Sequence, residues 1–433
     1  MSTMWRGQQA RGDTGRTIVH QEDSAVKPQQ HPVPTPEDGP PEVLETQVVI
    51  VGAGPAGLML AHLIEREGIA TVVVERRDAD TIHETHRAGI LEAGTVEMLV
   101  DSGVDGRVLS EGHEHEGTTL RFEGRSHHID FQDSVGRSVW LYPQNEVFWD
   151  LKNARERDGG TVFWSVTDTE VHDIETESPR VSFRDEHGTA REVRARILVG
   201  ADGSRSICRQ AIPESVRTDH FTEYPFAWFG ILCEAPPSYP ELIYTRSEAG
   251  FALVSQRSDT VQRMYFQCDP DTRAEDWSDE QIWARLQQCL SGPDGFRLTE
   301  GRIFDKTVLP FRSYVCEPLR HGSLVLVGDA GHTVPPTGAK GLNLAFCDVR
   351  TLAPALIALL RDGDDTGLAG YSAAALERVW KAQNFSYWAT RMLHRSAQDS
   401  EFDVKRQLGE LKAITGSEHG RAYFADSYTG WQG

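Results

Sequence analysis

A glycine-rich turn offers the first residues suited to chemistry. The string GAGPAG follows the apolar run VVIV and opens a stretch with helical apolar spacing. Its candidate binding residues are Gly52, Gly54, Ala56 and Gly57. A strand, a tight turn and a helix start in this order bring backbone N–H groups and the positive helix end to a pyrophosphate. Glu75 follows about 20 residues later, where a carboxylate suits a ribose diol. The pattern predicts a dinucleotide site.

Two further apolar runs end in Gly/Asp pairs, RILVGADG around Asp202 and SLVLVGDAG around Asp329. An Asp at the end of a strand can bind the ribityl hydroxyls of FAD. A glycine-rich segment from Gly338 to Asn343 leads into the helix that follows. The positive end of that helix would stabilise the negative charge of reduced flavin. A simple nicotinamide dehydrogenase has no use for this second glycine string, so the sequence favours FAD.

The elements that must position these residues indicate an α/β chain, α+β overall. Residues 47–77 read as a strand, a glycine turn, an amphipathic helix and a second strand, a Rossmann-like βαβ unit. Residues 221–311 alternate apolar and polar positions with many aromatics, which is typical of an antiparallel sheet. After Asp329 the spacing becomes helical.

We therefore expect four segments. Residues 1–46 are rich in Gln, Glu, Gly and Pro and lack an apolar period, which predicts a disordered or surface-draped tail. Residues 47–218 form the expected FAD-binding domain and residues 219–328 the substrate-binding β-sheet domain. Residues 329–433 form a flavin-contacting loop and a helical C-terminal region.

Composition excludes several classes of partner. The chain has 44 Lys and Arg against 65 Asp and Glu, a net charge of −21, and no Lys/Arg-rich run, which disfavours nucleic acid. The longest apolar run with helical spacing, residues 352–360, is far shorter than the roughly 20 residues of a membrane span. The N-terminus lacks an apolar signal segment, and the six cysteines lack CxxC spacing. We expect a cytoplasmic protein with no membrane partner and no metal site.

Several strings together resemble one family. GAGPAG, ADG at residues 201–203 and GDAGH at residues 328–332 are similar to the three fingerprints of the single-component, FAD-dependent aromatic hydroxylases. RAGILE at residues 87–92, YPFAWFG at 224–230, PPTGAKGLN at 335–343 and SEHGRAYFADSYTG at 417–430 extend the resemblance. It runs from about residue 47 to about residue 431, which is the whole chain except the tail.

The resemblance implies a flavin-dependent monooxygenase that converts 4-hydroxybenzoate to 3,4-dihydroxybenzoate (protocatechuate). Its co-substrates are NADH or NADPH and O2, and oxygen is transferred through a C4a-hydroperoxyflavin. A homodimer is also implied. One alternative is a sister hydroxylase acting on 4-aminobenzoate or 3,4-dihydroxybenzoate. Another is a flavin-binding NAD(P)H oxidase or sensor without hydroxylation, which would have no use for the tyrosines described below.

Three residues form a candidate carboxylate site. Ser255 and Arg257 share one face of a predicted strand, and Tyr265 falls on the next strand after a short turn. A guanidinium fork and two hydroxyls would meet the carboxylate of a benzoate. The resembling family uses the matching positions for this contact.

The resemblance also implies a proton relay. Tyr244 would contact the 4-hydroxyl of the substrate, and Tyr428 would continue the hydrogen-bond chain towards His115, which opens to solvent. A phenolate activates the ring better than a phenol, and a histidine near its ordinary pKa of about 6.5 can release the proton at neutral pH. Pro336 would present its carbonyl to the substrate hydroxyl.

Further cofactor contacts rest on the resemblance alone. Arg87 would lie over the FAD pyrophosphate and Gln144 beside the ribityl chain. The remaining implied positions are Ala88, Gly89 and Leu342.

The electron donor stays open at this stage. Candidate contacts to NAD(P)H are Arg76, Arg77, Arg205 and Arg209. Thr81 and Thr85 stand where strictly NADPH-dependent relatives carry a tyrosine and an arginine, which removes a partner for the 2′-phosphate. We therefore expect NADH, or both donors, as readily as NADPH.

Overall fold

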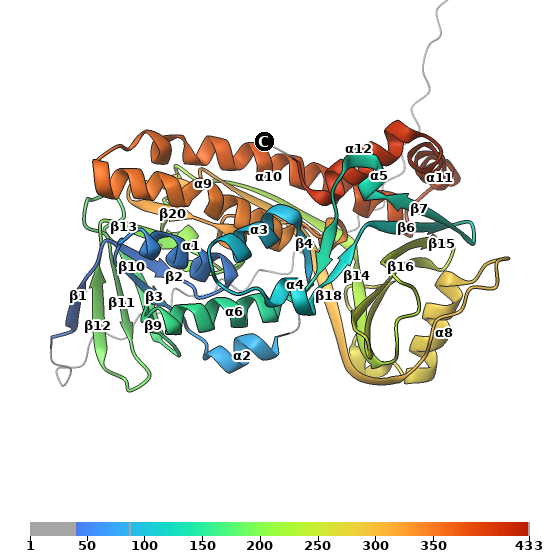
Figure 1. Cartoon of the computed structure of the whole chain (residues 1–433), viewed down its shortest axis with the longest axis horizontal. Helices are drawn as coiled ribbons and strands as arrows, with labels where there is room; N and C mark the ends of the chain where they lie inside the picture. The colour runs from blue at the N-terminus through green and yellow to red at the C-terminus, as the bar shows by residue number, and fades with distance from the viewer. Residues whose placement is uncertain (1–39, 86–87, 432–433) are drawn as a thin grey trace, which may run out of the picture. The chain divides into compact units, whose positions relative to one another are not determined.

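The structure is a computed structural model that describes residues 40–85 and 88–431 (Figure 1). Most of the expected tail, residues 1–39, lies outside this range. The expectation of a tail up to residue 46 is wrong for β1 (Glu42–Glu45), which pairs in parallel with β12 (Ala190–Arg194). Leu44 packs against the apolar core, and Glu42 forms an ion pair with Arg191 at 2.6 Å. Composition alone does not predict these contacts with distant residues.

A six-stranded sheet contains the strands that precede the GAGPAG turn and the two Gly/Asp pairs. Its order is β19-β20-β13-β2-β3-β9, parallel except for β19. The strands are β2 (Val48–Val51), β3 (Thr71–Val74), β9 (Thr161–Phe163), β13 (Ile197–Gly200), β19 (Arg320–His321) and β20 (Leu324–Leu326). The predicted βαβ unit and the mixed α/β class are confirmed. Because β2, β13 and β20 are parallel neighbours, the segments that follow them meet at one edge of the sheet.

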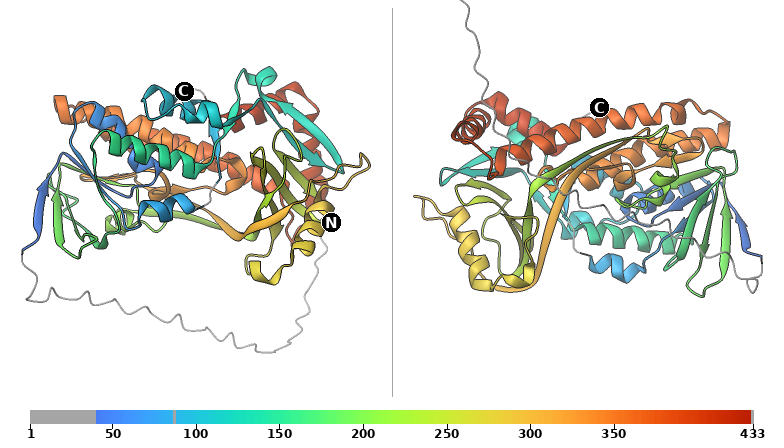
Figure 2. Two further views of the ribbon diagram at one scale, coloured as in Figure 1. Left: turned by 60° about the horizontal axis from the view of Figure 1, so that its bottom comes forward. Right: turned by 180° about the vertical axis from the view of Figure 1, so that it is seen from behind.

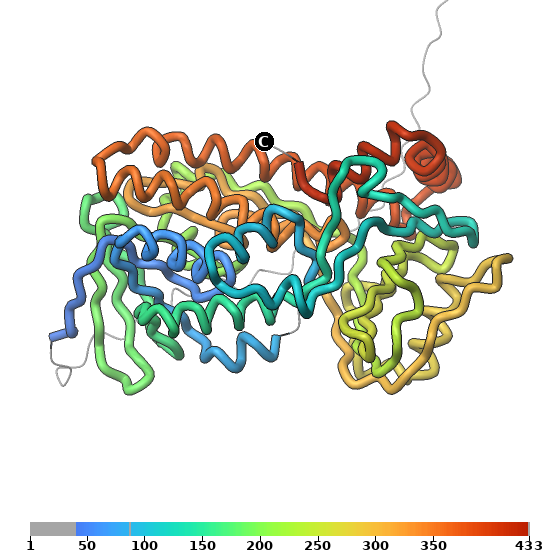
Figure 3. The backbone as a smooth tube through the Cα atoms, viewed as in Figure 1, coloured from blue at the N-terminus to red at the C-terminus, as the bar shows by residue number. Residues whose placement is uncertain are grey.

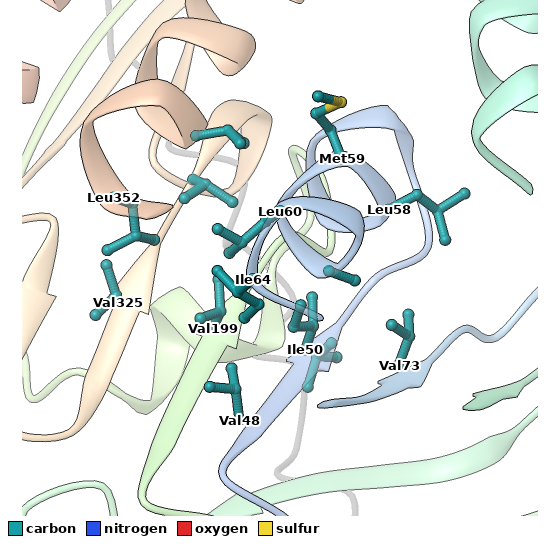
Figure 4. Close-up of a cluster of buried hydrophobic side chains, with 14 of the residues drawn as sticks. Val48, Ile50, Leu58, Met59, Leu60, Ile64, Val73, Val199, Val325 and Leu352 are labelled. Atoms are coloured by element: carbon teal, nitrogen blue, oxygen red, sulfur yellow. The ribbon is translucent and has the colours of Figure 1, made fainter. Parts of the chain in front are cut away.

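Two helices cover this sheet with apolar side chains. α1 (Pro55–Arg66) and α9 (Gly341–Asp362) pack against each other. Figure 4 shows the contact, where Leu60 and Ile64 of α1 lie among Val199, Val325 and Leu352. α6 (Gln144–Arg157) packs against α1, and α10 (Thr366–Leu393) packs along α9.

Among the described helices, α9 is the one long and apolar enough to cross a bilayer. However, 61% of its apolar window is buried within the protein, where Val349, Leu352 and Leu356 belong to the core. Such burial is typical of a core helix. The apolar window in α9 is longer than the run 352–360 that was noted in the sequence.

An eight-stranded, largely antiparallel sheet forms the second part. Its order is β21-β18-β14-β17-β16-β15-β6-β7, with one parallel pair, β15 and β6. The strands are β6 (Gly117–Phe122), β7 (Arg125–Asp130), β14 (Thr218–Glu234), β15 (Ile243–Ser247), β16 (Gly250–Ser258), β17 (Val261–Cys268), β18 (Arg302–Glu317) and β21 (His332–Thr333). Figure 2 shows β14 and β18 running side by side along most of their length.

The sheets cross the expected domain boundaries. β6 and β7 come from the segment 47–218 but join the eight-stranded sheet, whereas β19 and β20 come from the segment 219–328 but join the six-stranded sheet. Local apolar patterns do not reveal pairings between strands more than 100 residues apart, so contiguous boundaries could not capture this exchange.

The C-terminal helices return to the eight-stranded sheet. α11 (Glu401–Thr415) and α12 (Glu418–Thr429) contact β7, and α12 also contacts α5 (Phe131–Val135) (Figure 3). A further sheet has three strands in the order β4-β8-β5, and these are β4 (Ile90–Glu92), β8 (Val139–Leu141) and β5 (His113–His115). The remaining elements are α2 (Ala79–Glu84), α3 (Ala93–Asp101), α4 (Arg107–Glu111), α7 (Ile207–Ala211), α8 (Asp279–Leu290), β10 (Thr167–His172) and β11 (Arg180–Arg184).

Truncation of the core under α9 should destabilise the protein. Leu352 is fully buried, so Leu352→Ala should lower the free energy of unfolding by about 2–5 kcal/mol, because it removes apolar contacts and leaves a cavity. Urea denaturation followed by circular dichroism measures the change. Leu109→Ala, at a side chain that is 49% exposed, is the control and should change stability by less than about 1 kcal/mol. Equal effects of the two substitutions would contradict this packing.

Candidate active site

A cavity of about 610 Å³ lies at the edge of the six-stranded sheet where the GAGPAG turn and the two Gly/Asp segments meet. This volume is within the range of small-molecule and cofactor sites. Most of the predicted cofactor and donor residues line it. They are Gly52, Gly54, Ala56, Glu75, Arg76, Arg77, Ala88, Gly89, Gln144, Arg205, Asp329 and Leu342, together with Pro336 from the predicted substrate set. Arg87 lies outside the described residues.

Two helices begin at this cavity. α1 starts after Gly54 and α9 after Lys340, and neither start has a side-chain cap, so N–H groups of the first turns have no cap acceptor. A Cβ added to Gly54 would meet nothing within 4 Å, which shows open space beside this turn. Uncapped helix starts favour anions. One such start suits a diphosphate and the other the negative charge of a reduced flavin, so the cavity fits FAD.

Two glycines serve packing at the turn. Gly52 has φ +109°, and a Cβ there would lie 2.2 Å from the carbonyl oxygen of Ala201. A Cβ on Gly57 would lie 2.1 Å from the carbonyl oxygen of Gly52. Gly57 therefore lets α1 approach β2 closely and does not line the cavity.

Glu75 holds the turn as well as facing the cavity. Its carboxylate is 6% exposed and accepts the Ala53 N–H at 2.9 Å through Oε2. Oε1 accepts the Arg77 N–H at 3.0 Å, and the Arg77 side chain lies 3.4 Å from the same oxygen. The end of β3 is thereby tied to the glycine turn after β2, with the acid placed beside the predicted ribose position.

Asn343 and Gly338 support the cavity from behind. The Asn343 side chain accepts hydrogen bonds from Glu92 N–H and Thr95 Oγ1 and donates to the carbonyl oxygens of Ile90 and Ala339, all at 2.9 Å. A Cβ on Gly338 would lie 2.6 Å from Ser386 Oγ of α10. Neither residue lines the cavity, so their side chains position the start of α9 instead of contacting a ligand.

A buried carboxylate fixes the Asp329 segment. Asp348 of α9 accepts the Gly328 N–H at 2.8 Å and lies 2.7 Å from Nε2 of His332. Both side chains are 2% exposed. Burial alone lowers the pKa of His332, but the facing Asp348 carboxylate raises it above its ordinary value. The sequence analysis missed this pair, although a lone charge between the apolar positions 344–346 and 349 of a helix is a readable signal.

The predicted substrate tyrosines form a buried hydrogen bond. The hydroxyls of Tyr244 and Tyr428 lie 2.8 Å apart, and each residue is 2% exposed. Burial raises the pKa of both hydroxyls. On the sheet, Tyr244 pairs with Leu253, and Leu253 pairs with Tyr265, so these three residues lie side by side across β15, β16 and β17.

Aromatic residues wall this pocket region. Tyr244, Tyr265 and Tyr428 share one apolar cluster with Trp228, whose ring lies 5.0 Å from that of Tyr265. A Cβ on Gly230 would lie 2.6 Å from the Tyr265 ring, so this glycine leaves room for it. The same cluster includes Ile90 and Ala339, which also line the cavity. The tyrosine pair and the cofactor cavity are therefore neighbours.

The predicted carboxylate site has a half-buried cation. Burial, together with the nearby Arg263, lowers the pKa of Arg257 to about 10, which leaves it charged at neutral pH. Its Nη2 donates to Oδ1 of Asn145, a residue of the cavity wall, at 2.6 Å. Ser255 is 8% exposed and donates its hydroxyl to the carbonyl oxygen of Arg263 at 3.1 Å.

The expectation for His115 is wrong in two respects. Its side chain does not open to solvent, since it is 2% exposed, and neither ring nitrogen has a hydrogen-bond partner among the described residues. Burial lowers its pKa to about 4, so it is neutral at pH 7 and does not titrate near 6.5. Within the described chain no hydrogen bond joins it to Tyr428.

One of the predicted NAD(P)H contacts, Arg209, is used elsewhere. Arg209 donates to the carbonyl oxygens of Ala330 at 2.7 Å and Ser204 at 2.9 Å, and does not line the cavity. Thr81 donates its hydroxyl to Asp78 at 2.6 Å, whereas Thr85 lines the cavity. Of the two arginines predicted to contact NAD(P)H after the ADG turn, Arg205 is the one that is exposed and lines the cavity.

These features define a class, an FAD-dependent flavoprotein with a buried aromatic pocket beside the cofactor. Comparison with known proteins agrees. A model of the FAD binding domain matches residues 45–386. Over 390 residues the chain is 41% identical to the p-hydroxybenzoate hydroxylase of Acinetobacter baylyi, covering 90% of this chain and 96% of that protein. The chain belongs to the family of FAD-dependent aromatic hydroxylases, and it is an FAD-dependent aromatic monooxygenase.

More distant relatives share the fold with less identity. A probable NADH-specific resorcinol 4-hydroxylase of Rhodococcus jostii is 26% identical over 344 residues, covering 75% of this chain and 61% of that protein. The crystal structure of p-nitrophenol 4-monooxygenase from Pseudomonas putida superposes with a TM-score of 0.73 at 20% identity, over 90% of this chain and 100% of that one. The latter shows the fold alone.

The buried His115 predicts a pH dependence of stability. With a folded pKa of about 4 against an ordinary 6.5, it binds fewer protons in the folded than in the unfolded protein between these values. Stability is therefore lost as the pH falls from 6.5 towards 4, by up to about 3 kcal/mol from this group. His115→Gln should flatten the dependence of the urea midpoint on pH across this window. The exposed His419→Gln is the control, and equal slopes for the two variants would contradict the assignment.

Proposed function

We propose that this monooxygenase hydroxylates 4-hydroxybenzoate at the carbon next to the hydroxyl, giving 3,4-dihydroxybenzoate. The balanced reaction consumes one NAD(P)H, one proton and one O2, and releases NAD(P)+ and one water. One observation carries the proposal: a half-buried cation, Arg257 of β16, and a buried hydroxyl pair, Tyr244 of the neighbouring β15 and Tyr428 of α12, adjoin the cofactor cavity. A ring acid with a hydroxyl para to its carboxylate places the carboxylate at the cation and the hydroxyl at the tyrosine pair. The name of the 41%-identical relative supports the same substrate.

The proposed roles follow from the geometry. Arg257 binds the carboxylate together with the hydroxyl of Tyr265, and the Ser255 hydroxyl joins them by turning away from the Arg263 carbonyl oxygen. Tyr244 accepts a hydrogen bond from the substrate hydroxyl while its own hydroxyl donates to Tyr428, so electron density shifts from the substrate hydroxyl towards the carbon to be attacked. Bound FAD supplies hydride acceptance from the nicotinamide and activation of O2. Burial of the tyrosine pair keeps water away from the reacting ring.

The proposed cofactor contacts use the cavity wall. The α1 start at Gly54 and Ala56 holds the diphosphate, Glu75 the ribose diol, and Asp329 with Gln144 the ribityl chain. The α9 start at residues 341–342 lies at the flavin pyrimidine.

We propose that the chain uses NADH, or both donors. Arg76 lines the cavity and is exposed, but Thr85 occupies the wall without a positive charge for a 2′-phosphate. Initial rates with NADH and NADPH, measured side by side at saturating 4-hydroxybenzoate, test this. A rate with NADPH more than a hundredfold above that with NADH would contradict it.

We further propose a cytoplasmic homodimer with no membrane and no nucleic-acid partner. The net charge of −21 and the burial of α9 support the absence of those two partners. Trp380 and Tyr387, 42% and 46% exposed and seven residues apart on α10, offer apolar surface to a second subunit. Sedimentation velocity tests the subunit number.

The reaction itself is tested with purified holoenzyme. Oxidation of the donor should be stimulated by 4-hydroxybenzoate and should yield one 3,4-dihydroxybenzoate per NAD(P)H. The same assay with 4-aminobenzoate and 3,4-dihydroxybenzoate tests the related ring acids. Oxidation that is indifferent to 4-hydroxybenzoate and yields only H2O2 would overturn the proposal.

Removal of the proposed carboxylate partner should weaken substrate binding. Arg257→Ala should cost about 2–5 kcal/mol of binding free energy for 4-hydroxybenzoate, because the substrate carboxylate would be buried without its cation. The change in flavin absorbance on titration measures the dissociation constant. Arg125→Ala, at an exposed position of β7, is the control. A near-normal dissociation constant for Arg257→Ala would remove this residue from the site.

Loss of the second hydroxyl should weaken activation of the substrate ring. Tyr428→Phe leaves the Tyr244 hydroxyl without its partner at 2.8 Å, so this hydroxyl should become a weaker hydrogen-bond acceptor for the substrate hydroxyl. Flavin reduction should continue, but the hydroxylated fraction of NAD(P)H consumed should fall, with H2O2 making up the difference. Product and H2O2 are measured in the same reaction. Tyr423→Phe, at a 53% exposed ring of the same helix, is the control, and unchanged coupling in Tyr428→Phe would count against the relay.

A further inference from the structure

Asn145 links the cofactor cavity to the predicted carboxylate site. It is the second residue of α6, follows Gln144 and lines the cofactor cavity. Its Oδ1 accepts a hydrogen bond from Nη2 of Arg257 at 2.6 Å, across to the eight-stranded sheet. Its Nδ2 donates to Oε1 of Glu146 at 3.2 Å. One side-chain amide thus lies between a half-buried cation and a carboxylate.

The chemistry of the two partners requires an amide at this place. A guanidinium only donates hydrogen bonds, and an ionised carboxylate only accepts them. Asn145 meets both because it carries an acceptor oxygen and a donor nitrogen. An aspartate would accept from Arg257 but could not donate to Glu146, and it would add a negative charge. An alanine would do neither.

Glu146 is itself held in place, which fixes the amide. Its Oε2 accepts from Nη2 of Arg107 at 3.0 Å, and its Oε1 lies 3.1 Å from Nε2 of His83. Its side chain is 25% exposed. Because these contacts restrain the carboxylate, Asn145 has one favoured orientation, and so does the guanidinium group that donates to it.

The electrostatic surroundings make this orientation matter. Arg257 is half-buried and repelled by Arg263, while Glu146 favours its charged form. The Asn145 amide lies between Glu146 and Arg257 and is hydrogen-bonded to both. A guanidinium recognises a carboxylate through directional, paired N–H groups, so a rotated plane loses contact even when the charge remains.

We propose that Asn145 is a positioning residue for carboxylate recognition: it orients the guanidinium of Arg257 so that the site selects ring acids over neutral phenols. This deepens the proposed function and rests on it, because it takes Arg257 as the partner of the substrate carboxylate. The prediction that Asn145 acts through Arg257 distinguishes it from a residue that only stabilises α6 or the cofactor cavity.

The test compares two ligands in the same holoenzyme. 4-Hydroxybenzoate carries the carboxylate, and 4-hydroxybenzamide keeps the ring and the hydroxyl without the charge. Dissociation constants are measured from the flavin absorbance change in the unaltered protein and in Asn145→Ala and Asn145→Asp. Asn153→Ala, at an exposed position of the same helix, is the matched control. The ratio of the two constants is taken within each variant, so a loss of FAD or of folding that affects both ligands alike cancels.

Asn145→Ala should weaken 4-hydroxybenzoate about tenfold, the usual range for a lost hydrogen bond to a charged group, and 4-hydroxybenzamide by less than about twofold. Asn145→Asp should weaken 4-hydroxybenzoate further, since its carboxylate competes for Arg257. Asn153→Ala should leave both constants unchanged. An unchanged ratio in Asn145→Ala and Asn145→Asp would overturn the inference alone. Failure of the unaltered protein to bind 4-hydroxybenzoate would overturn the proposed function, and this inference with it.

Discussion

Two helix starts without side-chain caps open on one cavity, and the rest of the structure serves this arrangement. α1 begins beyond β2 and α9 beyond β20, so each brings unsatisfied N–H groups and a positive end to the same edge of the parallel sheet. Such groups are costly to bury without an acceptor and favourable next to an anion. The two starts therefore demand a ligand with negative charge at two separated places, which FAD provides.

The surrounding residues hold those two starts in place. Glu75 ties β3 to the first glycine turn, and the buried Asp348 ties the Asp329 segment to α9. Lys340, 2% exposed, forms an ion pair with Glu92 at 2.6 Å and donates to the carbonyl oxygen of Tyr428 at 2.9 Å. The start of α9 is thus joined directly to the helix that carries one of the two pocket tyrosines. The net charge of −21 describes the surface, whereas the site meets anions with backbone N–H groups and a few buried cations.

Local patterns predicted the parts of the fold that depend on local geometry. The glycine turn, the βαβ unit and the two later strand ends were readable because each needs a specific order of residue types. Pairings across long separations were not: β6 and β7 join strands more than 100 residues away, and β1 pairs with β12. In the site, the strand spacing pointed to Arg257, whereas Tyr244 and Tyr428 were expected from the family resemblance alone. The burial of His115, the four hydrogen bonds of Asn343 and the bridging role of Asn145 depend on neighbours that only the folded chain supplies.

The central claim is that the starts of α1 and α9 hold opposite parts of one FAD. A crystal structure of the protein with FAD bound tests it most directly. The account predicts diphosphate oxygens against the N–H groups at the start of α1 and the pyrimidine edge of the flavin against the start of α9, with the ribose hydroxyls at Glu75. A diphosphate bound away from the Gly52–Gly57 turn, or a flavin whose pyrimidine edge faces away from α9, would contradict it.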